Sequence, residues 1–304
     1  MACTRTLDAW LPRTGGAMSF TRVDGHYMQL PCGQCDDCKA SRASEAAIRV
    51  MAEASVYNET AFLTLTYSDD NLPGLKKTPS LSMVHLQKFH KRLRHHIGAI
   101  RYYAVGEYGD RTQRPHYHGC YFGLSHRMFQ DSQLYTDSTK GKLYSSAKLD
   151  AIWGHGTCKI GGLTTASAKY TAQYILKKIY GQASAQEYEN RLPPFVLQSQ
   201  SLGAQWVRLW PSDVRTGLIC IPNEDGSSAP QPIPRAMLRR LKLEDPETYQ
   251  YISEKRSEKS RLKRVADEER SRREHAQAII TQQRINLKPR IFGEQNNGKS
   301  SSHR

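Results

Sequence analysis

The segment from Ile100 to Phe122 constrains the fold most, because two strand-like runs flank one short polar turn. Ile100–Tyr108 and Arg114–Phe122 are rich in aromatic and β-forming residues, and Gly109–Gln113 joins them. Two strands joined by so short a turn pair antiparallel. The sequence therefore predicts a β-hairpin, and its chemistry depends on which side chains the hairpin gathers on one face.

Two histidines lie two residues apart on the second strand of this hairpin. Side chains alternate along a strand, so His116 and His118 share a face while Tyr117 points the other way. Hairpin pairing can bring the Glu107 carboxylate beside both imidazoles. Two histidines and one carboxylate suit a catalytic divalent ion with open coordination positions rather than a closed structural site. The plainer alternative is a surface hairpin with incidental histidines.

A second candidate site lies on a helix that we expect from Thr164 to Tyr180, ended by Gly181. One face carries three polar side chains at helical spacing, namely Tyr170, Tyr174 and Lys177. Another stripe can pack on the protein interior: Ala168, Ala172, Ile175 and Ile179. A tyrosine hydroxyl, with an ordinary pKa of about 10, is a poor nucleophile at neutral pH. A metal that polarises the electrophile, with a nearby cation, would make its attack feasible. Two tyrosines on a helix without such a metal are more often packing residues.

The remaining segments predict a mixture of helices and strands. Helices are expected over 41–57 and from an N-cap at Ser80 to His96, and strands over 61–68, 157–160 and after Pro194. The first 45 residues, 125–148 and the Gly/Ser/Pro-rich 223–234 are expected to be irregular. We expect an α+β fold in three parts: a cysteine-rich segment and helix (1–58), a core (59–222), and a linker, a charged helical region and a disordered tail (223–304).

Three of the seven cysteines are crowded into a C-x2-C-x2-C pattern made by Cys32, Cys35 and Cys38. A tetrahedral zinc site takes four ligands, and Cys3 is a reasonable fourth. We expect a small structural zinc site. Three free thiols in a turn are an equally plain alternative, and an iron–sulfur cluster is another. The odd and uneven cysteine count argues against a disulfide framework and for a reduced, cytosolic compartment.

The charge balance favours a polyanionic partner: 44 Lys and Arg against 29 Asp and Glu give a formal net charge of +15. DNA, RNA and an anionic membrane surface all fit such a charge. Candidate phosphate-binding residues are Lys88, Lys91, Arg92, Arg94 and Arg114. The basic run over 255–273 is either a solvated tail or a further DNA-binding segment. No apolar run is long enough to span a membrane, and the start of the chain lacks a signal-peptide pattern.

Several of these segments together resemble the HUH endonuclease superfamily of single-stranded DNA nickases. Within it, the chain is similar to the replication initiators of the Microviridae, particularly the gokushovirus type. The main segments are FLTLTYSDDNLP (62–73), RYYAVGEYGDRTQRPHYHGCYFG (101–123) and KYTAQYILKK (169–178). Supporting segments are LPCGQCDDCKASRA, IWGHG (152–156) and FVLQSQSLG (195–203). The likeness extends to about residue 270.

The resemblance implies a central antiparallel sheet that carries the hairpin, and a nicking mechanism. His116 and His118 would bind Mg²⁺ or Mn²⁺ with Glu107 as third ligand. Tyr170 or Tyr174 would attack the scissile phosphate, giving a 5′-phosphotyrosine and a free 3′-OH that primes rolling-circle synthesis. The other tyrosine would cut the regenerated origin. Lys177 would orient the phosphate or the attacking tyrosine.

The resemblance also implies partners. These are the viral origin, as single-stranded or replicative-form DNA, and a host polymerase in the cytoplasm of a bacterium. A host helicase is expected as well, because the chain has no G-x-x-x-x-G-K-[ST] phosphate loop. No membrane partner is expected.

Two features set limits on the resemblance. Gly119 and Cys120 follow the histidine pair, where bulkier β-forming residues are expected. No third histidine comes just after the pair, which weakens the case for a conjugative relaxase. The alternatives that stay open are an HUH transposase or relaxase, and a non-catalytic zinc-containing nucleic-acid-binding protein. In the last of these, Tyr170 and Tyr174 would be dispensable.

Overall fold

The computed structural model describes residues 3–75, 78–138, 141–174, 186–188, 191–222, 226–264, 277–281 and 283. The chain divides into two compact units, one of Met1–Cys38 with Ala266–Arg304 and one of Lys39–Val265. This division differs in its boundaries from the three parts expected from the sequence, which stay a prediction. No helix in the described ranges is long and apolar enough to cross a membrane.

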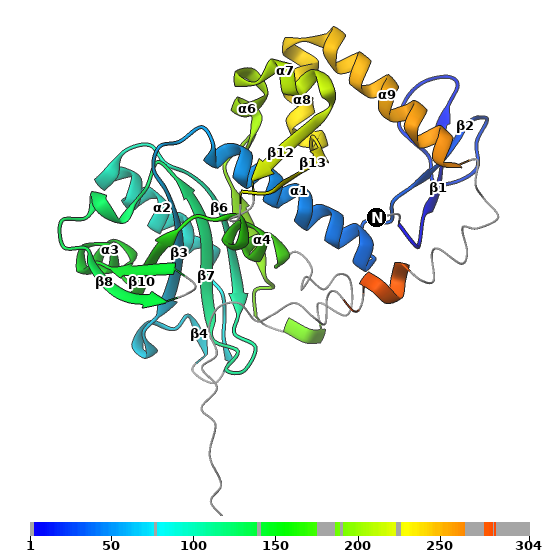
Figure 1. Cartoon of the computed structure of the whole chain (residues 1–304). Helices are drawn as coiled ribbons and strands as arrows, with labels where there is room; N and C mark the ends of the chain where they lie inside the picture. The colour runs from blue at the N-terminus through cyan, green and yellow to red at the C-terminus, as the bar shows by residue number, and fades with distance from the viewer. Residues whose placement is uncertain are drawn as a thin grey trace, which may run out of the picture. The chain divides into compact units, whose positions relative to one another are not determined.

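The larger unit is built on a seven-stranded sheet in the order β11-β6-β7-β3-β10-β9-β8 (Figure 1). Every neighbouring pair is antiparallel, which confirms the α+β class and the expected sheet. The expected hairpin is β6 with β7, and β7 and β3 lie at the centre. The strands are β3 (Thr60–Tyr67), β6 (Arg101–Tyr108), β7 (Pro115–Phe122), β8 (Gln133–Ser138), β9 (Gly141–Ser145), β10 (Gly156–Gly162) and β11 (Phe195–Gln198).

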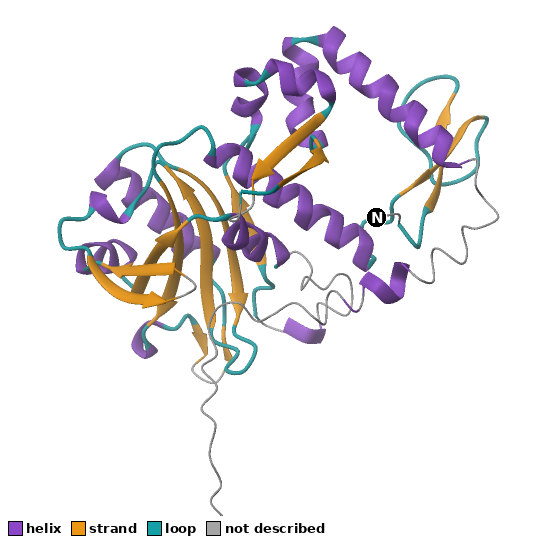
Figure 2. Cartoon of the chain, viewed as in Figure 1, coloured by secondary structure: helices purple, strands orange, loops and turns teal. Residues whose placement is uncertain are grey.

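Helices cover both faces of this sheet (Figure 2). On one face α2 (Met83–Ile97) and α3 (Ala147–Trp153) pack against residues that include Leu65 and Tyr117. On the other face α1 (Asp36–Ala54) and α4 (Thr165–Gln173) pack against residues that include Phe62 and Cys120. Because side chains alternate along each strand, the two faces have separate cores.

A third core lies on the other side of α1. Ile48 and Ala52 of that helix pack with buried side chains from a group of helices and a β-hairpin. These elements are α6 (Ala204–Leu209), α7 (Pro211–Thr216), β12 (Leu218–Pro222), β13 (Ser228–Pro232), α8 (Arg235–Glu244) and α9 (Pro246–Arg264). The charged helical region is therefore confirmed as far as residue 264, and the tail over 293–304 lies outside the described residues.

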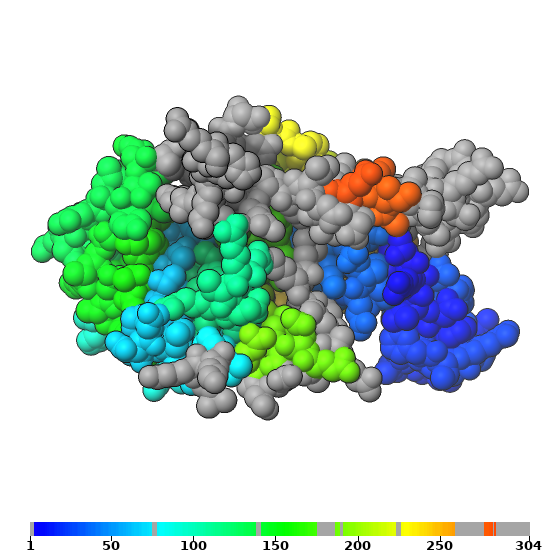
Figure 3. All heavy atoms as spheres, turned by 90° about the horizontal axis from the view of Figure 1, so that it is seen from below, coloured from blue at the N-terminus to red at the C-terminus, as the bar shows by residue number. Residues whose placement is uncertain are grey.

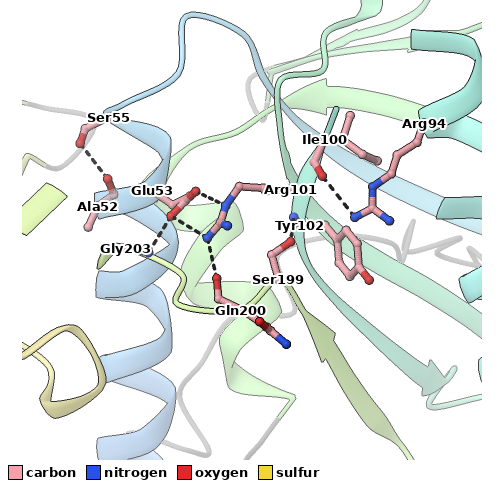
Figure 4. A network of polar contacts seen from close by, with 10 residues as sticks. All are labelled: Ala52, Glu53, Ser55, Arg94, Ile100, Arg101, Tyr102, Ser199, Gln200 and Gly203. Atoms are coloured by element: carbon pink, nitrogen blue, oxygen red, sulfur yellow. Dashed lines mark hydrogen bonds and ion pairs between the residues drawn. The ribbon is translucent and has the colours of Figure 1, made fainter. Parts of the chain in front are cut away.

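One buried carboxylate ties α1 to the sheet (Figure 4). Glu53, whose side chain is 1% exposed, accepts hydrogen bonds from Arg101 Nε on β6 at 2.6 Å and from Gly203 N at 2.6 Å. Arg101 also donates to the Gln200 carbonyl at 2.8 Å. A charge buried to this extent needs such partners. The network therefore fixes α1 against the start of β6 and the segment that follows β11.

The smaller unit contains an antiparallel hairpin of β1 (Leu7–Pro12) and β2 (Gly25–Leu30). The C-terminal residues 277–281 belong to the same unit and lie against its N-terminal residues (Figure 3). Thr281 Oγ1 donates to Asp37 Oδ1 at 3.1 Å, and both residues are buried. The helix α1 begins in this unit.

Several local expectations were wrong. The first 45 residues are not irregular, because they form β1, β2 and the start of α1. The range 125–148 contains the β8–β9 hairpin, and 223–234 contains β13. These strands are short and polar, so they lack the apolar alternation that predicts a strand. The N-cap of α2 is Ser82, which accepts from His85 N at 3.2 Å, whereas Ser80 Oγ accepts from Leu192 N at 2.9 Å.

The smallest elements are two short helical turns and a short strand pair. They are η1 (Asp69–Asn71), η2 (His126–Met128), β4 (Gly74–Leu75) and β5 (Thr78–Pro79). The helix expected over 164–180 is described as α4 to Gln173, and its remainder lies outside the described residues.

Candidate active site

The register of three central strands gathers the predicted metal ligands on one face of the sheet. Glu107 of β6 lies directly opposite His116 of β7, and Thr64 of β3 lies opposite His118. Glu107 and His118 are buried, with side chains 6% and 8% exposed, and His116 is 19% exposed. The hairpin thus places all three predicted side chains in one half-closed position.

The three side chains converge closely enough to share one ion. Glu107 Oε1 lies 2.7 Å from His116 Nε2 and 3.2 Å from His118 Nε2. The two imidazole rings are 4.9 Å apart and nearly perpendicular, at 86°. One candidate ligand atom from each residue lies within 4.8 Å of the others. Two imidazole nitrogens and one carboxylate oxygen are a donor set that binds divalent metals while leaving positions open.

Neighbouring groups hold both imidazoles with Nε2 toward Glu107. His116 Nδ1 lies 3.1 Å from the Arg114 carbonyl oxygen, which can only accept, so this nitrogen carries the proton. His118 Nδ1 lies 3.0 Å from Thr64 Oγ1. Hydrogen bonds at Nδ1 are the usual means of orienting a metal-binding histidine through Nε2.

The pKa of Glu107 reflects these contacts. Burial raises the pKa of the carboxyl, but the hydrogen bonds and charges of His116 and His118 outweigh it and leave the pKa below its ordinary value. Glu107 is therefore a carboxylate at neutral pH. The site presents a fixed negative charge beside two histidine nitrogens.

Helix α4 brings both predicted tyrosines to this cluster. Tyr170 Oη lies 3.5 Å from His118 Nε2, with the two rings 5.2 Å apart. Tyr174 stacks on His118 at 5.9 Å and 13°, and it lies 5.1 Å from Tyr170 between ring centres. Phe62 stacks on His118 at 5.6 Å. The tyrosine pair and the histidine pair therefore form one continuous site.

The small residues that departed from the family pattern explain how α4 comes so close. Cys120 is fully buried on the site face of β7, and its Sγ lies 3.6 Å from Thr171 Oγ1 of α4. On the opposite face, a Cβ on Gly119 would lie 2.6 Å from the Tyr121 ring. A bulkier side chain at Cys120 would push α4 away from the histidines, and one at Gly119 would collide with Tyr121.

The tyrosine hydroxyls are poor nucleophiles in this environment without help. Burial raises the pKa of Tyr170 and that of Tyr174, and the negative charge of Glu107 raises both further. A positive charge beside the hydroxyls would act in the opposite direction. The arrangement therefore suits a reaction in which cationic groups accompany the substrate.

The predicted basic residues lie apart from this site. Helix α2 covers the opposite face of the sheet, with Lys88 and Lys91 exposed. Arg92 donates to the carbonyls of Ile152 and Trp153 at 2.6 and 2.7 Å, and Arg94 donates to that of Ile100 at 3.3 Å. These internal contacts give both arginines a structural role, and DNA binding by α2 stays a prediction.

Two further candidates complete the account of the basic residues. Arg114 pairs with Asp69 Oδ1 at 2.5 Å and donates to the Tyr67 carbonyl at 2.5 Å, so it holds the base of β7. Lys177 lies outside the described residues. Their predicted roles toward DNA stay predictions.

Sequence reasoning missed Thr64 and Phe62 as residues of the site. The alternation of β3 places them on one face of that strand. Their place beside His118 depends on β3 pairing with β7, a contact between strands more than 50 residues apart that no local pattern predicts.

The predicted cysteine cluster also converges, within the smaller unit. One Sγ from each of Cys3, Cys32, Cys35 and Cys38 lies within 4.8 Å of the others. The remaining thiols are dispersed, with Cys120 and Cys158 buried and Cys220 exposed. All seven cysteines are free.

Known proteins resemble the chain over the part that carries this site. Residues 60–179 match the family model for replication-associated protein ORF2, a range that spans β3, the β6–β7 hairpin and α4. Replication-associated protein VP4 of Bdellovibrio phage phiMH2K is 28% identical over 262 residues, 82% of this chain and 80% of that protein.

Two further relatives cover less of the chain. Replication-associated protein ORF2 of Spiroplasma virus 4 is 34% identical over 59% of this chain and 62% of that protein. Replication-associated protein ORF4 of Chlamydia phage 1 is 33% identical over 53% of this chain and 43% of that protein. No solved structure matches the chain.

Proposed function

Because the chain is similar to the replication-associated proteins of small phages, we propose that it starts rolling-circle replication by nicking one DNA strand. The resemblance to Microviridae replication proteins expected from the sequence is confirmed by these relatives. The proposed reaction is a site-specific transesterification in single-stranded DNA. It leaves a 5′-phosphotyrosine on the protein and a free 3′-OH on the DNA.

The observation that carries this proposal is the 3.5 Å distance between Tyr170 Oη and His118 Nε2. It places a nucleophile beside a cluster suited to holding a phosphate through a divalent ion. Tyr170 Oη would form a bond to phosphorus while the bond from phosphorus to the 3′ oxygen breaks. The tyrosine loses its proton and the 3′ oxygen gains one. One ester is thereby exchanged for another, so the strand can later be rejoined.

Glu107, His116 and His118 would hold Mg²⁺ or Mn²⁺, which when bound withdraws charge from the phosphate and favours the tyrosinate. The observed donor set fits such an ion. Thr64 and the Arg114 carbonyl keep both imidazoles aimed at that position. We also assign Lys177 to orienting the phosphate or the attacking tyrosine.

The second tyrosine has a distinct task in this proposal. Tyr174 lies 5.1 Å from Tyr170 between ring centres, so both hydroxyls can serve one phosphate-binding position. Tyr170 would hold the 5′ end while Tyr174 cuts the regenerated origin after one round. A host polymerase would extend the 3′-OH and a host helicase would unwind the duplex, in the cytoplasm of a bacterium.

The test is a covalent adduct assay. The full chain is incubated with origin-bearing single-stranded DNA and Mn²⁺ or Mg²⁺, and a protein–DNA adduct is sought on a denaturing gel. We expect an adduct that needs the metal and disappears in His116→Ala, His118→Ala and the double variant Tyr170→Phe/Tyr174→Phe. The matched control is Tyr135→Phe, which removes the hydroxyl of an exposed tyrosine.

Two outcomes would overturn the proposal. Failure to form an adduct with any viral origin strand would remove the enzymatic function. Nicking that persists in the double tyrosine variant would remove the proposed nucleophiles. Tight DNA binding without an adduct would favour the non-catalytic alternative, and joining of unrelated strands without origin specificity would favour a transposase.

A further inference from the structure

Four cysteines far apart in the sequence converge in the smaller unit. Cys3 precedes β1, Cys32 follows β2, and Cys35 and Cys38 lie at the start of α1. The base of the β1–β2 hairpin and the first turn of α1 therefore meet at four sulfur atoms. Nothing in the proposed nicking reaction uses them.

The spacing of the sulfurs is that of a mononuclear tetrahedral site. The four Sγ atoms lie within 4.8 Å of one another, and those of Cys3 and Cys35 are 3.7 Å apart. Zinc–sulfur bonds of about 2.3 Å at tetrahedral angles place sulfurs about 3.8 Å apart. A disulfide requires about 2.0 Å. In an iron–sulfur cluster the cysteines bind different irons, which spreads their sulfurs further.

Backbone N–H groups point at the sulfurs. Cys32 N donates to Cys3 Sγ at 3.3 Å, and Cys35 N and Gln34 N donate to Cys32 Sγ at 3.3 and 3.4 Å. The turn that makes this possible passes through Gly33, whose φ of 75° favours glycine. Such N–H groups stabilise thiolates, which are the form that binds metal.

The smaller unit has little else to hold its hairpin. Among the residues of β1 and β2 only Ala9 is buried, while Leu7, Leu11 and Tyr27 are 45%, 42% and 51% exposed. A small unit with so little apolar burial needs a cross-link or a metal to fold stably. The sulfurs lie where such a link closes the hairpin at its base.

We propose that Cys3, Cys32, Cys35 and Cys38 bind one zinc ion that holds the β1–β2 hairpin to the first turn of α1. The four thiols lose their protons to solvent as four Zn–S bonds form, and no electron is transferred. With four sulfur ligands the ion has no open position, so its role is structural. This site is separate from the one at Glu107, His116 and His118.

The first test is metal content. The full chain, purified without chelator or added metal, is analysed by inductively coupled plasma mass spectrometry. We expect about one zinc per chain, lost in Cys32→Ser and Cys35→Ser. Cys220→Ser is the matched control, because it removes an exposed thiol elsewhere. His116→Ala/His118→Ala should keep the zinc, which assigns the metal to the cysteines.

The second test does not depend on whether the cysteine variants fold. The unsubstituted chain is stripped of metal and titrated with Co²⁺. Four thiolates should give intense tetrahedral d–d bands and sulfur-to-cobalt charge-transfer bands that saturate at one equivalent, and added Zn²⁺ should abolish them. Absence of these bands overturns the proposal. A Cys3–Cys35 disulfide found by mass spectrometry, or bound iron with sulfide, overturns it too.

Discussion

At the scale of single residues, His118 is the point on which the candidate site depends. Phe62 and Tyr174 stack on its ring, Thr64 lies at Nδ1, and Glu107 and Tyr170 lie near Nε2. The sequence predicted His118, Glu107 and both tyrosines. It could not predict what orients the imidazole, because that depends on the neighbouring strand.

Thr64→Val tests this orientation, since valine keeps the shape of threonine without its hydroxyl. We expect Mn²⁺ to bind about 10-fold more weakly, because groups that orient a metal-binding histidine typically contribute about 10- to 100-fold to affinity. The measurement is adduct formation as a function of Mn²⁺ concentration, with recovery at high Mn²⁺. Thr66→Val is the control, because Thr66 Oγ1 contacts Thr157 and no histidine. Equal losses in both variants would contradict the role of Thr64.

The two tyrosines should differ in the first cleavage. Tyr170 Oη lies 3.5 Å from His118 Nε2, whereas Tyr174 contacts His118 with the flat of its ring and is 8% exposed. We expect Tyr170→Phe to lower the rate of the first adduct by at least about 100-fold, and Tyr174→Phe to lower it much less. Single-turnover kinetics on an origin oligonucleotide measures both. The reverse order would assign the first attack to Tyr174.

His90 gives a pH dependence that is independent of the site. Burial, with a smaller contribution from Arg94, lowers the pKa of His90 to about 3, and its Nε2 lies 2.9 Å from Tyr121 Oη. Unfolded histidine has a pKa of about 6.5, so stability is lost as pH falls from about 6.5 toward 3, by up to about 1.4 kcal/mol per pH unit.

The check is urea unfolding of the parent and His90→Phe at several values of pH between 7 and 5. We expect the variant to lose a smaller free energy of unfolding over this interval, by up to about one proton's share. Its stability at pH 7 can change in either direction, because phenylalanine cannot bond to Tyr121. Identical slopes in the two proteins would show that His90 does not titrate as described.

At the scale of elements, the fit of α4 on β7 decides whether nucleophile and histidines meet. The helix begins with a capping box between Thr164 and Ser167, and it presents Ala168 and Ala172 to the sheet. Cys120 faces it from β7. Small residues at this contact set a short distance between helix and strand.

Cys120→Leu should disturb that fit. Extra methylene groups in a packed core cost about 1–3 kcal/mol, and here they would also move Tyr170 away from His118. We expect a lower free energy of unfolding in urea and a slower first cleavage. Cys220→Leu, at an exposed cysteine, should change stability by less than about 0.5 kcal/mol. If Cys120→Leu nicked at the parental rate, the packing distance would not matter.

The elements also separate what local sequence can predict from what it cannot. The β6–β7 hairpin and α4 carry strong local signals, so their positions were predicted within a residue or two over the described range. The β8–β9 and β1–β2 hairpins are polar and exposed, so no apolar pattern marks them. The order of the strands, which places β3 beside β7, depends on contacts distant in the sequence.

At the scale of the whole molecule, the basic residues behind the net charge of +15 lie over both faces of the sheet. Lys88 and Lys91 lie on α2, over the face opposite the histidines, whereas Lys169 is exposed on α4 beside Tyr170. A strand whose phosphate reaches Tyr170 must run along the α4 face. The position of a lysine, more than the total charge, should therefore decide its contribution to DNA binding.

Salt dependence measures those contributions separately. Each phosphate contact on single-stranded DNA contributes about 0.7 to the slope of log affinity against log salt. We expect Lys169→Gln to reduce the slope by about that amount, and Lys88→Gln/Lys91→Gln to leave it nearly unchanged, although the double variant removes twice the charge. Binding is followed by fluorescence anisotropy of an origin oligonucleotide between about 50 and 200 mM salt. A loss of about 1.4 in the double variant would instead mean that the DNA wraps onto α2, as the sequence first suggested.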